Sequence, residues 1–360
     1  MTQNNYIPFH CTYSPNVPDL LRELECSLAL TTYQAGKLII LSPKKEGGLI
    51  QLPRNFIKAM GLAVDGRRMA VATKEELIVL ANASGISLHF PPQPGQYDAL
   101  FVPRACYYTG EIDIHDMHWG KEGLYAVVTA FSCIALMDDQ YSFTPVWKPN
   151  FIQDIDARDH CHLNGMAMEN DKPKYVTAFG KTNTNKGWRN DVLTGGIVID
   201  TENQEIITTG LSMPHSPRIY DGNLFLLTSA TGELIQIDRN NGKKEVVTRV
   251  PGFARGMCKW GDYLFICLSR IRKSSSVFRD LPIRYKDVNC GVEIIHLPTG
   301  MKAGHIGYEN DVEELYDIQI LHSYLRPGIL NHTENIHKSI LNTPDFDLWK
   351  EYKSEEKLPL

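Results

Sequence analysis

The residues best suited to chemistry in this sequence are histidines in its middle part. The segment "EIDIHDMHWG", residues 111–120, holds two histidines and three acids within eight positions. His162, His215 and Arg255 follow farther along the chain. Neutral imidazole binds transition metals and accepts protons near neutral pH, and arginine binds carboxylates or phosphates through paired hydrogen bonds. What these residues can do depends on whether the fold brings them together.

The elements that would position them belong to a repeat. Six segments share a two-residue signature, a short apolar stretch, a polar turn and a second apolar stretch. The signatures begin at Met60, His115, Asn164, Ser216, Arg255 and Tyr316. Val, Ile, Leu, Phe and Tyr dominate the apolar stretches, and Asp-Gly, Thr-Gly and Asn-Gly pairs separate them, which is typical of β-strands joined by tight turns. The irregular spacing favours four-stranded propeller blades with loop insertions.

The two ends of the chain are predicted to share one blade. The N-terminal "LALTTYQAGKLIIL" matches the pattern of "LFLLTSATGELIQI" in a complete copy but lacks an inner strand before it. The last copy, "YDIQILHSYLRPGIL", supplies one apolar strand and then no more. Pairing the two would satisfy the open sheet edges. We predict an all-β protein, a six-bladed β-propeller closed by its N- and C-terminal strands with the C-terminal strand innermost; seven blades is the alternative.

Three regions follow from this prediction. Residues 1–27 form an N-terminal extension, residues 28–330 form a single β-propeller domain, and residues 331–360 form a C-terminal tail. The stretches "VPDLLRELECS" and "DFDLWKEYKSEEKLPL" at the two ends are expected to form short helices on the outside.

Composition excludes several classes of partner. The chain of 360 residues has a net charge of -5 with scattered Lys and Arg, so neither nucleic acid nor an anionic membrane is an expected partner. No stretch approaches the roughly 18 apolar residues of a membrane span, and the N-terminus lacks a signal-peptide pattern. The eight cysteines contain no C-x-x-C pair, which favours reduced thiols in the core. A cytoplasmic location is therefore expected.

The repeat predicts that the candidate residues meet on one face. In a propeller, inner strands begin beside the central channel, on the face that also carries the loops between second and third strands. Two long insertions, "GKTNTNKGWRNDVLTGG" and "RIRKSSSVFRDLPIRYKDVNCG", fall in such loops. The expected catalytic residues are His115, His162, His215 and Arg255. The expected substrate-binding residues are Asp113, Asn164, Trp188, Arg189, Arg270, Arg272 and Tyr316.

Two chemistries fit this arrangement. In the first, His115, His162 and His215 bind a divalent transition metal, Mn, Fe or Zn, and Asp113 or Asp116 orients an imidazole. In the second, a histidine acts as general base without a metal, while arginines hold an anionic group and stabilise developing negative charge.

Strand geometry divides the histidines of the 111–120 segment. In an extended strand, residues alternate between two sides, so His115 and His118 cannot both face the channel. His115 aligns with Asn164 and Arg255 and is the better candidate, which leaves His118 a structural role. His215 stands one position out of step with His115 in this alignment.

The motifs "TTYQAGKL", "HLNGMA", "MPHSPR" and "GFARGM" span nearly the whole chain. In this combination they resemble an uncharacterised bacterial family of predicted β-propeller proteins, a domain of unknown function. At the level of fold the chain is also similar to two characterised propeller types. The gluconolactonase type has six blades but holds its metal with acidic and amide side chains, whereas the oligogalacturonate-lyase type has a histidine-rich manganese site but seven blades.

These observations favour an enzyme whose active site lies at the mouth of the propeller channel. The expected substrate is a small anion, a sugar acid or another carboxylate, and the expected chemistry is that of a lyase, isomerase or hydrolase. The alternative is a non-catalytic propeller that binds a peptide, glycan or protein partner on the same face. The oligomeric state stays open.

Overall fold

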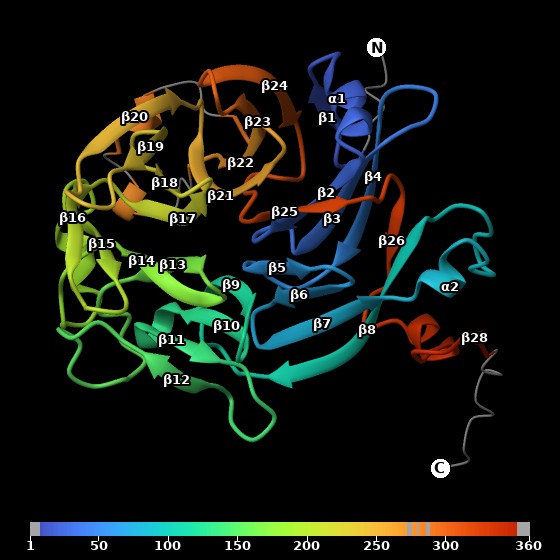
Figure 1. Cartoon of the computed structure of the whole chain (residues 1–360), viewed down its shortest axis with the longest axis horizontal. Helices are drawn as coiled ribbons and strands as arrows, with labels where there is room; N and C mark the ends of the chain where they lie inside the picture. Colours follow the sequence, from blue (N-terminus) through green and yellow to red (C-terminus); the bar gives the residue numbers. More distant parts are fainter. Residues whose placement is uncertain (1–7, 272–275, 279–280, 286–288, 351–360) are drawn as a thin grey trace.

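The computed structural model describes residues 8–271, 276–278, 281–285 and 289–350. Within them, six small sheets surround a central axis (Figure 1). The predicted six-bladed β-propeller is therefore confirmed. No helix in this part of the chain is long and apolar enough to cross a membrane.

The strands of the first three blades run outward from the axis in the following order. Blade 1 contains β25 (Ile318–His322), β2 (Cys26–Thr32), β3 (Lys37–Pro43) and β4 (Leu49–Asn55). Blade 2 contains β5 (Leu62–Asp65), β6 (Arg68–Ala72), β7 (Glu76–Asn82), β8 (Ala99–Tyr108) and β26 (Pro327–Ile329). Blade 3 contains β9 (Ile114–Gly120), β10 (Gly123–Val128), β11 (Cys133–Leu136) and β12 (Thr144–Trp147).

The remaining blades follow the same plan. Blade 4 contains β13 (Leu163–Glu169), β14 (Lys172–Ala178), β15 (Gly196–Asp200) and β16 (Ile206–Leu211). Blade 5 contains β17 (Pro214–Tyr220), β18 (Asn223–Thr228), β19 (Glu233–Ile237) and β20 (Lys244–Arg249). Blade 6 contains β21 (Phe253–Trp260), β22 (Tyr263–Ser269), β23 (Gly291–His296), β24 (Met301–Tyr308) and β1 (Cys11–Tyr13).

The ring closes as predicted. β25 pairs antiparallel with β2, with Cys26 opposite His322 and Leu30 opposite Ile318, and it is the innermost strand of blade 1. Two further strands from the ends add to other blades, since β1 lies beside β24 and β26 lies parallel to β8. Each end of the chain is thereby fixed to two blades.

The helical segments are short. They are α1 (Val17–Glu23), α2 (Ser84–Ser87) and five 3-10 turns, η1 (Thr129–Phe131), η2 (Gly187–Asn190), η3 (Ser276–Phe278), η4 (Pro282–Tyr285) and η5 (Asn335–Ser339), among the described residues. The expected N-terminal helix is confirmed by α1. The expected helix in the tail is wrong for Asp347–Trp349, because this segment is β28 and pairs with β27 (Ile340–Asn342); residues 351–360 lie outside the described part.

The inner strands carry repeated irregularities at the end where they begin. In β9, β13, β17 and β21 the pairing with the second strand slips beside His115, Asn164, Ser216 and Arg255, respectively. A β-bulge breaks the two-sided alternation of a strand and turns a side chain to a new direction. Of the candidate catalytic residues, His115 and Arg255 therefore stand on bulges, where the alternation of the strand is broken.

Contacts between neighbouring inner strands alternate around the ring. A hydroxyl from blades 1, 3 and 5 donates to a carbonyl near the start of the next blade's inner strand: Thr31 to Met60, Thr129 to Leu163 and Ser229 to Ala254. Blades 2, 4 and 6 instead place a glycine against the next blade, with Gly61 on Asp116, Gly165 on Pro217 and Gly256 on Asp317. A hydroxyl contact thus joins blades 1 and 2, blades 3 and 4, and blades 5 and 6, and a glycine contact joins each of these pairs to the next.

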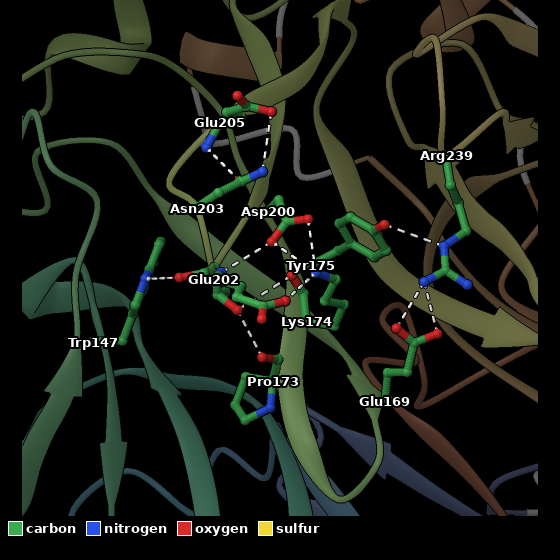
Figure 2. A network of polar contacts seen from close by, with 11 residues as sticks. Trp147, Glu169, Pro173, Lys174, Tyr175, Asp200, Glu202, Asn203, Glu205 and Arg239 are labelled. Carbon is green, nitrogen blue, oxygen red and sulfur yellow. Dashed lines mark hydrogen bonds and ion pairs between the residues drawn. The ribbon is translucent and has the colours of Figure 1, made fainter.

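The face opposite the strand starts is tied together by charged side chains. Figure 2 shows Arg239 of blade 5 reaching Glu169 and the Tyr175 hydroxyl of blade 4. The same view shows Lys174 between Asp200 and Glu202. These contacts lie on the face opposite the one that carries the candidate residues.

Candidate functional site

A cavity of about 360 Å³ lies where the inner strands begin, and we call it the mouth cavity. Seven side chains from blades 1, 3, 4, 5 and 6 form a closed circuit of ring contacts around it. In order they are His115, His162, Phe179, His215, Phe253, Arg255 and Tyr316, and Tyr316 returns to His115. The successive centroid distances lie between 4.5 and 6.0 Å. The fold therefore brings together the residues predicted to be catalytic.

His215 occupies the same structural position as His115. Asp113, His162 and Met213 each have a positive φ, and their carbonyls each accept a hydrogen bond from the end of the second strand, from Thr129, Phe179 and Ser229. His115 and His215 each follow this carbonyl by two residues. The extra residue that disturbed the sequence alignment comes after His215, at Ser216, where φ is 46°. Strained backbone repeated at equivalent positions is typical of functional sites.

The two equivalent histidines contact the backbone through the same ring nitrogen. Nδ1 of His115 lies 3.1 Å from the Asp113 carbonyl oxygen, and Nδ1 of His215 lies 3.2 Å from that of Met213. A carbonyl oxygen only accepts, so Nδ1 carries the proton. Nε2 is then the basic nitrogen in both neutral rings.

The surroundings of these histidines disfavour their charged forms. Burial lowers the pKa of His115 to about 4, and His162 and Arg255 act in the same direction while Asp113 opposes them. Burial and then Arg255 hold the pKa of His215 well below its usual range. Both rings are therefore neutral at pH 7, which suits proton acceptance or metal binding.

His162 differs from these two because it faces a carboxylate. Its Nδ1 lies 3.0 Å from Asp159 Oδ2, and the same oxygen accepts a hydrogen bond of 3.0 Å from Trp188 Nε1. The Trp188 ring also packs on His162 with centroids 4.4 Å apart. Asp159 therefore fixes the orientation of the His162 ring.

Cations prevail at the mouth cavity. Arg255 lies over the Tyr316 ring at 4.9 Å and over Phe253 at 5.2 Å. Lys186 and Arg189, which are exposed, line the rim, and Arg189 lies 5.2 Å from the Trp188 ring centroid. Asp113 and Asp159 are the lining carboxylates among the described residues. This balance suits an anionic ligand.

The geometry around the histidines bears on the metal hypothesis. Phe179 packs between His162 and His215, at 4.5 and 5.2 Å from their centroids. His162 also directs Nδ1 to Asp159. Within the described ranges, no group of three or more His, Cys, Asp or Glu side chains is arranged to hold a metal ion. A metal shared by His115, His162 and His215 stays a prediction.

Some predicted residues lie away from the mouth cavity. Asn164 is buried, and its Oδ1 accepts a hydrogen bond from Thr177. Arg270 donates to the Tyr308 carbonyl, and Arg272 lies outside the described residues. Asp116 does not orient a cavity imidazole, because it binds Arg218 through both oxygens and lies 3.4 Å from His118. The prediction that His118 stays out of the channel-mouth cluster agrees with this placement.

Several residues that line the mouth cavity were not among the predicted site residues. Asp159 is the most consequential, and its spacing of three residues before His162 was the available signal. Phe179 and Phe253 belong to ordinary apolar stretches, so their types gave no indication of a site. Tyr33 comes from a turn at the other end of the chain and reaches the cavity only because the ring closes.

The comparisons with known proteins identify a family without assigning an activity. A family model described as "Domain of unknown function (DUF4915)" matches residues 15–330. The chain belongs to this family. Among curated proteins, none matches it.

Solved structures share the propeller fold at low identity. A protein of unknown function from Bacteroides caccae has a TM-score of 0.51 and 10% identity, covering 82% of this chain and 98% of its own. A chain of a nidogen/laminin complex has a TM-score of 0.49 and 11% identity, covering 83% and 99%. A catalytically inactive virginiamycin B lyase from Staphylococcus aureus with quinupristin has a TM-score of 0.40 and 12% identity, covering 83% and 99%. Similarity at this level concerns the fold alone.

Proposed function

We propose that this protein is an enzyme that transfers protons to and from a small carboxylate substrate in the mouth cavity. The chemistry belongs to the lyase, isomerase or hydrolase classes. The observation that carries the proposal is the contact between His115 and His162, whose rings lie 5.0 Å apart in contrasting surroundings. One ring is held neutral and the other faces a carboxylate, which is how acid and base roles are separated in one site.

In the proposed reaction, Arg255 binds the substrate carboxylate. The bound negative charge raises the pKa of His115 from its low value, so its Nε2 becomes a stronger base as substrate arrives. His115 takes a proton from the carbon next to the carboxylate. His162, held through Nδ1 by Asp159, gives a proton from Nε2 to the departing or rearranging oxygen.

His215 has a supporting place in this scheme. Its Nδ1 lies 2.7 Å from Ser229 Oγ, whose own proton goes to the Ala254 carbonyl. This chain of contacts fixes the ring with Nε2 as the basic nitrogen. His215 therefore accepts a hydrogen bond from a substrate hydroxyl in the proposed complex.

The test uses proton exchange, which detects these reactions before a product is known. Purified protein is incubated in D2O with a panel of hydroxy acids and sugar acids, and ¹H NMR follows the signal of the proton next to the carboxylate. We expect exchange or product formation with at least one acid, and a loss of about 100-fold or more in His115→Asn and His162→Ala. His89→Ala, an exposed histidine near α2, is the control and keeps the wild-type rate.

Metal content and binding complete the test. Elemental analysis measures bound metal in wild type and in His115→Ala, His162→Ala and His215→Ala. Stoichiometric metal that all three changes remove, together with metal-dependent turnover, would favour the metal-centred form of the hypothesis. Carboxylate binding that Arg255→Ala abolishes, without exchange or turnover of any panel member, would favour the non-catalytic alternative.

A further inference from the structure

A second cavity opens on the same face, and we call it the side cavity. Its volume is about 640 Å³, and it lies between the β2–β3 turn of blade 1 and the β6–β7 turn of blade 2. Asn55, Ile57 and Lys58 form its inner wall, and His332 and Thr333 close it on the outside. All these segments lie at the strand ends that also surround the mouth cavity.

Tyr33 joins the two cavities because it lines both. Its ring lies 6.4 Å from Tyr316, which belongs to the circuit around the mouth cavity. On the other side, Lys58 Nζ lies 5.6 Å from the Tyr33 ring centroid. The aromatic ring therefore stands at the boundary, where a ligand that spans both cavities would pass over it.

The charged side chains on the wall of the side cavity contact other groups of the protein. Lys74 pairs with Glu75 and Glu111, and Glu76 lies 3.1 Å from Nε2 of His332. Lys37 donates to Asn55, and Lys58 lies over the Tyr33 ring. The uncharged polar side chains on its wall are Gln34, Asn55, Thr73 and Thr333. Such amides and hydroxyls bind a neutral ligand unit rich in hydroxyl groups.

Apolar surface complements these polar groups. The Tyr33 ring is half-buried, and the Ile57 side chain on the same wall is 70% exposed. A sugar ring has hydroxyls around its edge and C–H groups on its faces, so it matches a wall that offers both kinds of contact. A peptide with large apolar side chains or a polyphosphate would not match this mixture.

We propose that the substrate is an acidic glycoside whose charged sugar binds in the mouth cavity and whose neutral sugar binds in the side cavity across Tyr33. This inference rests on the proposed function and specifies its substrate class. At about 360 Å³, the mouth cavity is near the lower end of ligand-site volumes and suits one ring-sized unit.

Calorimetry tests the inference with aldobiouronic acids, in which a uronic acid is linked to a neutral sugar. The matched free uronic acids and neutral disaccharides are measured beside them. At least one aldobiouronic acid is expected to bind tenfold or more tightly than its free uronic acid. The exposed Gln34→Ala, which lines the side cavity and not the mouth cavity, is expected to remove this advantage without weakening the free acid. Tyr33→Ala is expected to remove the advantage as well. Tyr141→Ala, an exposed tyrosine on blade 3, is the control and changes neither affinity.

The outcomes separate the two proposals. Free uronic acids that bind through Arg255, with disaccharides that bind no more tightly, would overturn the substrate class and leave the proposed function standing. Equal weakening of both ligands by Gln34→Ala would also contradict the side cavity. Failure of every acid to bind, with Arg255→Ala like wild type, would overturn both proposals.

Discussion

At the scale of single residues, the site depends on histidines in unlike surroundings. His115 and His215 keep Nδ1 on a backbone carbonyl, and burial lowers the pKa of each. His162 instead meets the Asp159 carboxylate. The difference arises from where each histidine stands relative to the residue with positive φ. His115 and His215 each follow that residue by two positions, whereas His162 is itself that residue.

The low pKa of His115 predicts a pH dependence of stability. Between pH 4 and 6.5 the unfolded chain binds a proton at this histidine and the folded protein does not, so this contribution to stability is complete above pH 6.5 and is lost toward pH 4. Denaturant unfolding of wild type and His115→Asn should show wild type losing up to about 3 kcal/mol more on this acidification. Asparagine is suitable because Asn164 fills the equivalent position. Parallel stability curves would contradict the prediction.

Asp159 is expected to act through His162. Asp159→Asn keeps the side-chain shape but removes the carboxylate that contacts Nδ1 of His162. We expect proton exchange to fall at least tenfold, because the ring loses the contact that orients it. Chemical shifts of the Trp188 indole N–H report whether its hydrogen bond survives. An unchanged exchange rate would show that Asp159 only holds the loop together.

At the scale of elements, the inner strands combine bulges with close packing. Strand alternation separated His115 from His118 but could not predict the bulge at His115, since bulges depend on the neighbouring strand. Gly61, Gly165 and Gly256 each allow the inner strand of the next blade to approach closely. The three equivalent glycines differ in the space beside them, which permits a matched comparison.

The glycine series predicts graded losses of stability. A Cβ at Gly256 would lie 2.6 Å from Asp317 Cα, whereas one at Gly61 would lie 3.3 Å from a flexible Met117 side chain. We expect Gly256→Ala to cost about 1–3 kcal/mol and Gly61→Ala clearly less. Thermal and denaturant unfolding measure the difference. Equal losses of stability for Gly256→Ala and Gly61→Ala would contradict this prediction, because they would show that the added methyl group at Gly256 meets no closer contact than the one at Gly61.

At the scale of the whole molecule, a buried ion pair crosses the channel beneath the site. Arg218 of blade 5 binds both oxygens of Asp116 in blade 3 and also donates to the Met166 carbonyl of blade 4. Burial would raise the pKa of Asp116, but Arg218 and His118 hold it well below its usual range. Burial, aided by Asp116, raises the pKa of Asp317 to about 7. Charges from three blades therefore interact along one axis.

Removing one partner of this pair should destabilise the ring. Arg218→Met leaves the Asp116 charge buried without its cation, and we expect a loss of about 3–5 kcal/mol. The double variant Asp116→Asn/Arg218→Met removes both charges and should recover at least about 1 kcal/mol of this loss. Urea unfolding of the four proteins in the cycle measures the coupling. A double variant less stable than Arg218→Met would contradict this account.

The architecture could be predicted from the amino-acid pattern alone. Repeated apolar stretches and turns predicted six blades, and the incomplete copies at the two ends predicted the shared blade, because each open sheet edge needs a partner. The pattern also placed His115, His162, His215, Arg255 and Tyr316 at strand starts on one face. Local pattern was sufficient here since the starts of inner strands converge in any propeller.

The contacts between these residues became clear only from the folded chain. The bulge after His215 places this residue in the position equivalent to His115. Phe179 packs between His162 and His215, and Asp159 contacts Nδ1 of His162. Ring closure brought Tyr33 from the first blade to the mouth cavity and opened the side cavity next to it. Such details depend on packing between segments far apart in the chain, and no local spacing in the sequence records that packing.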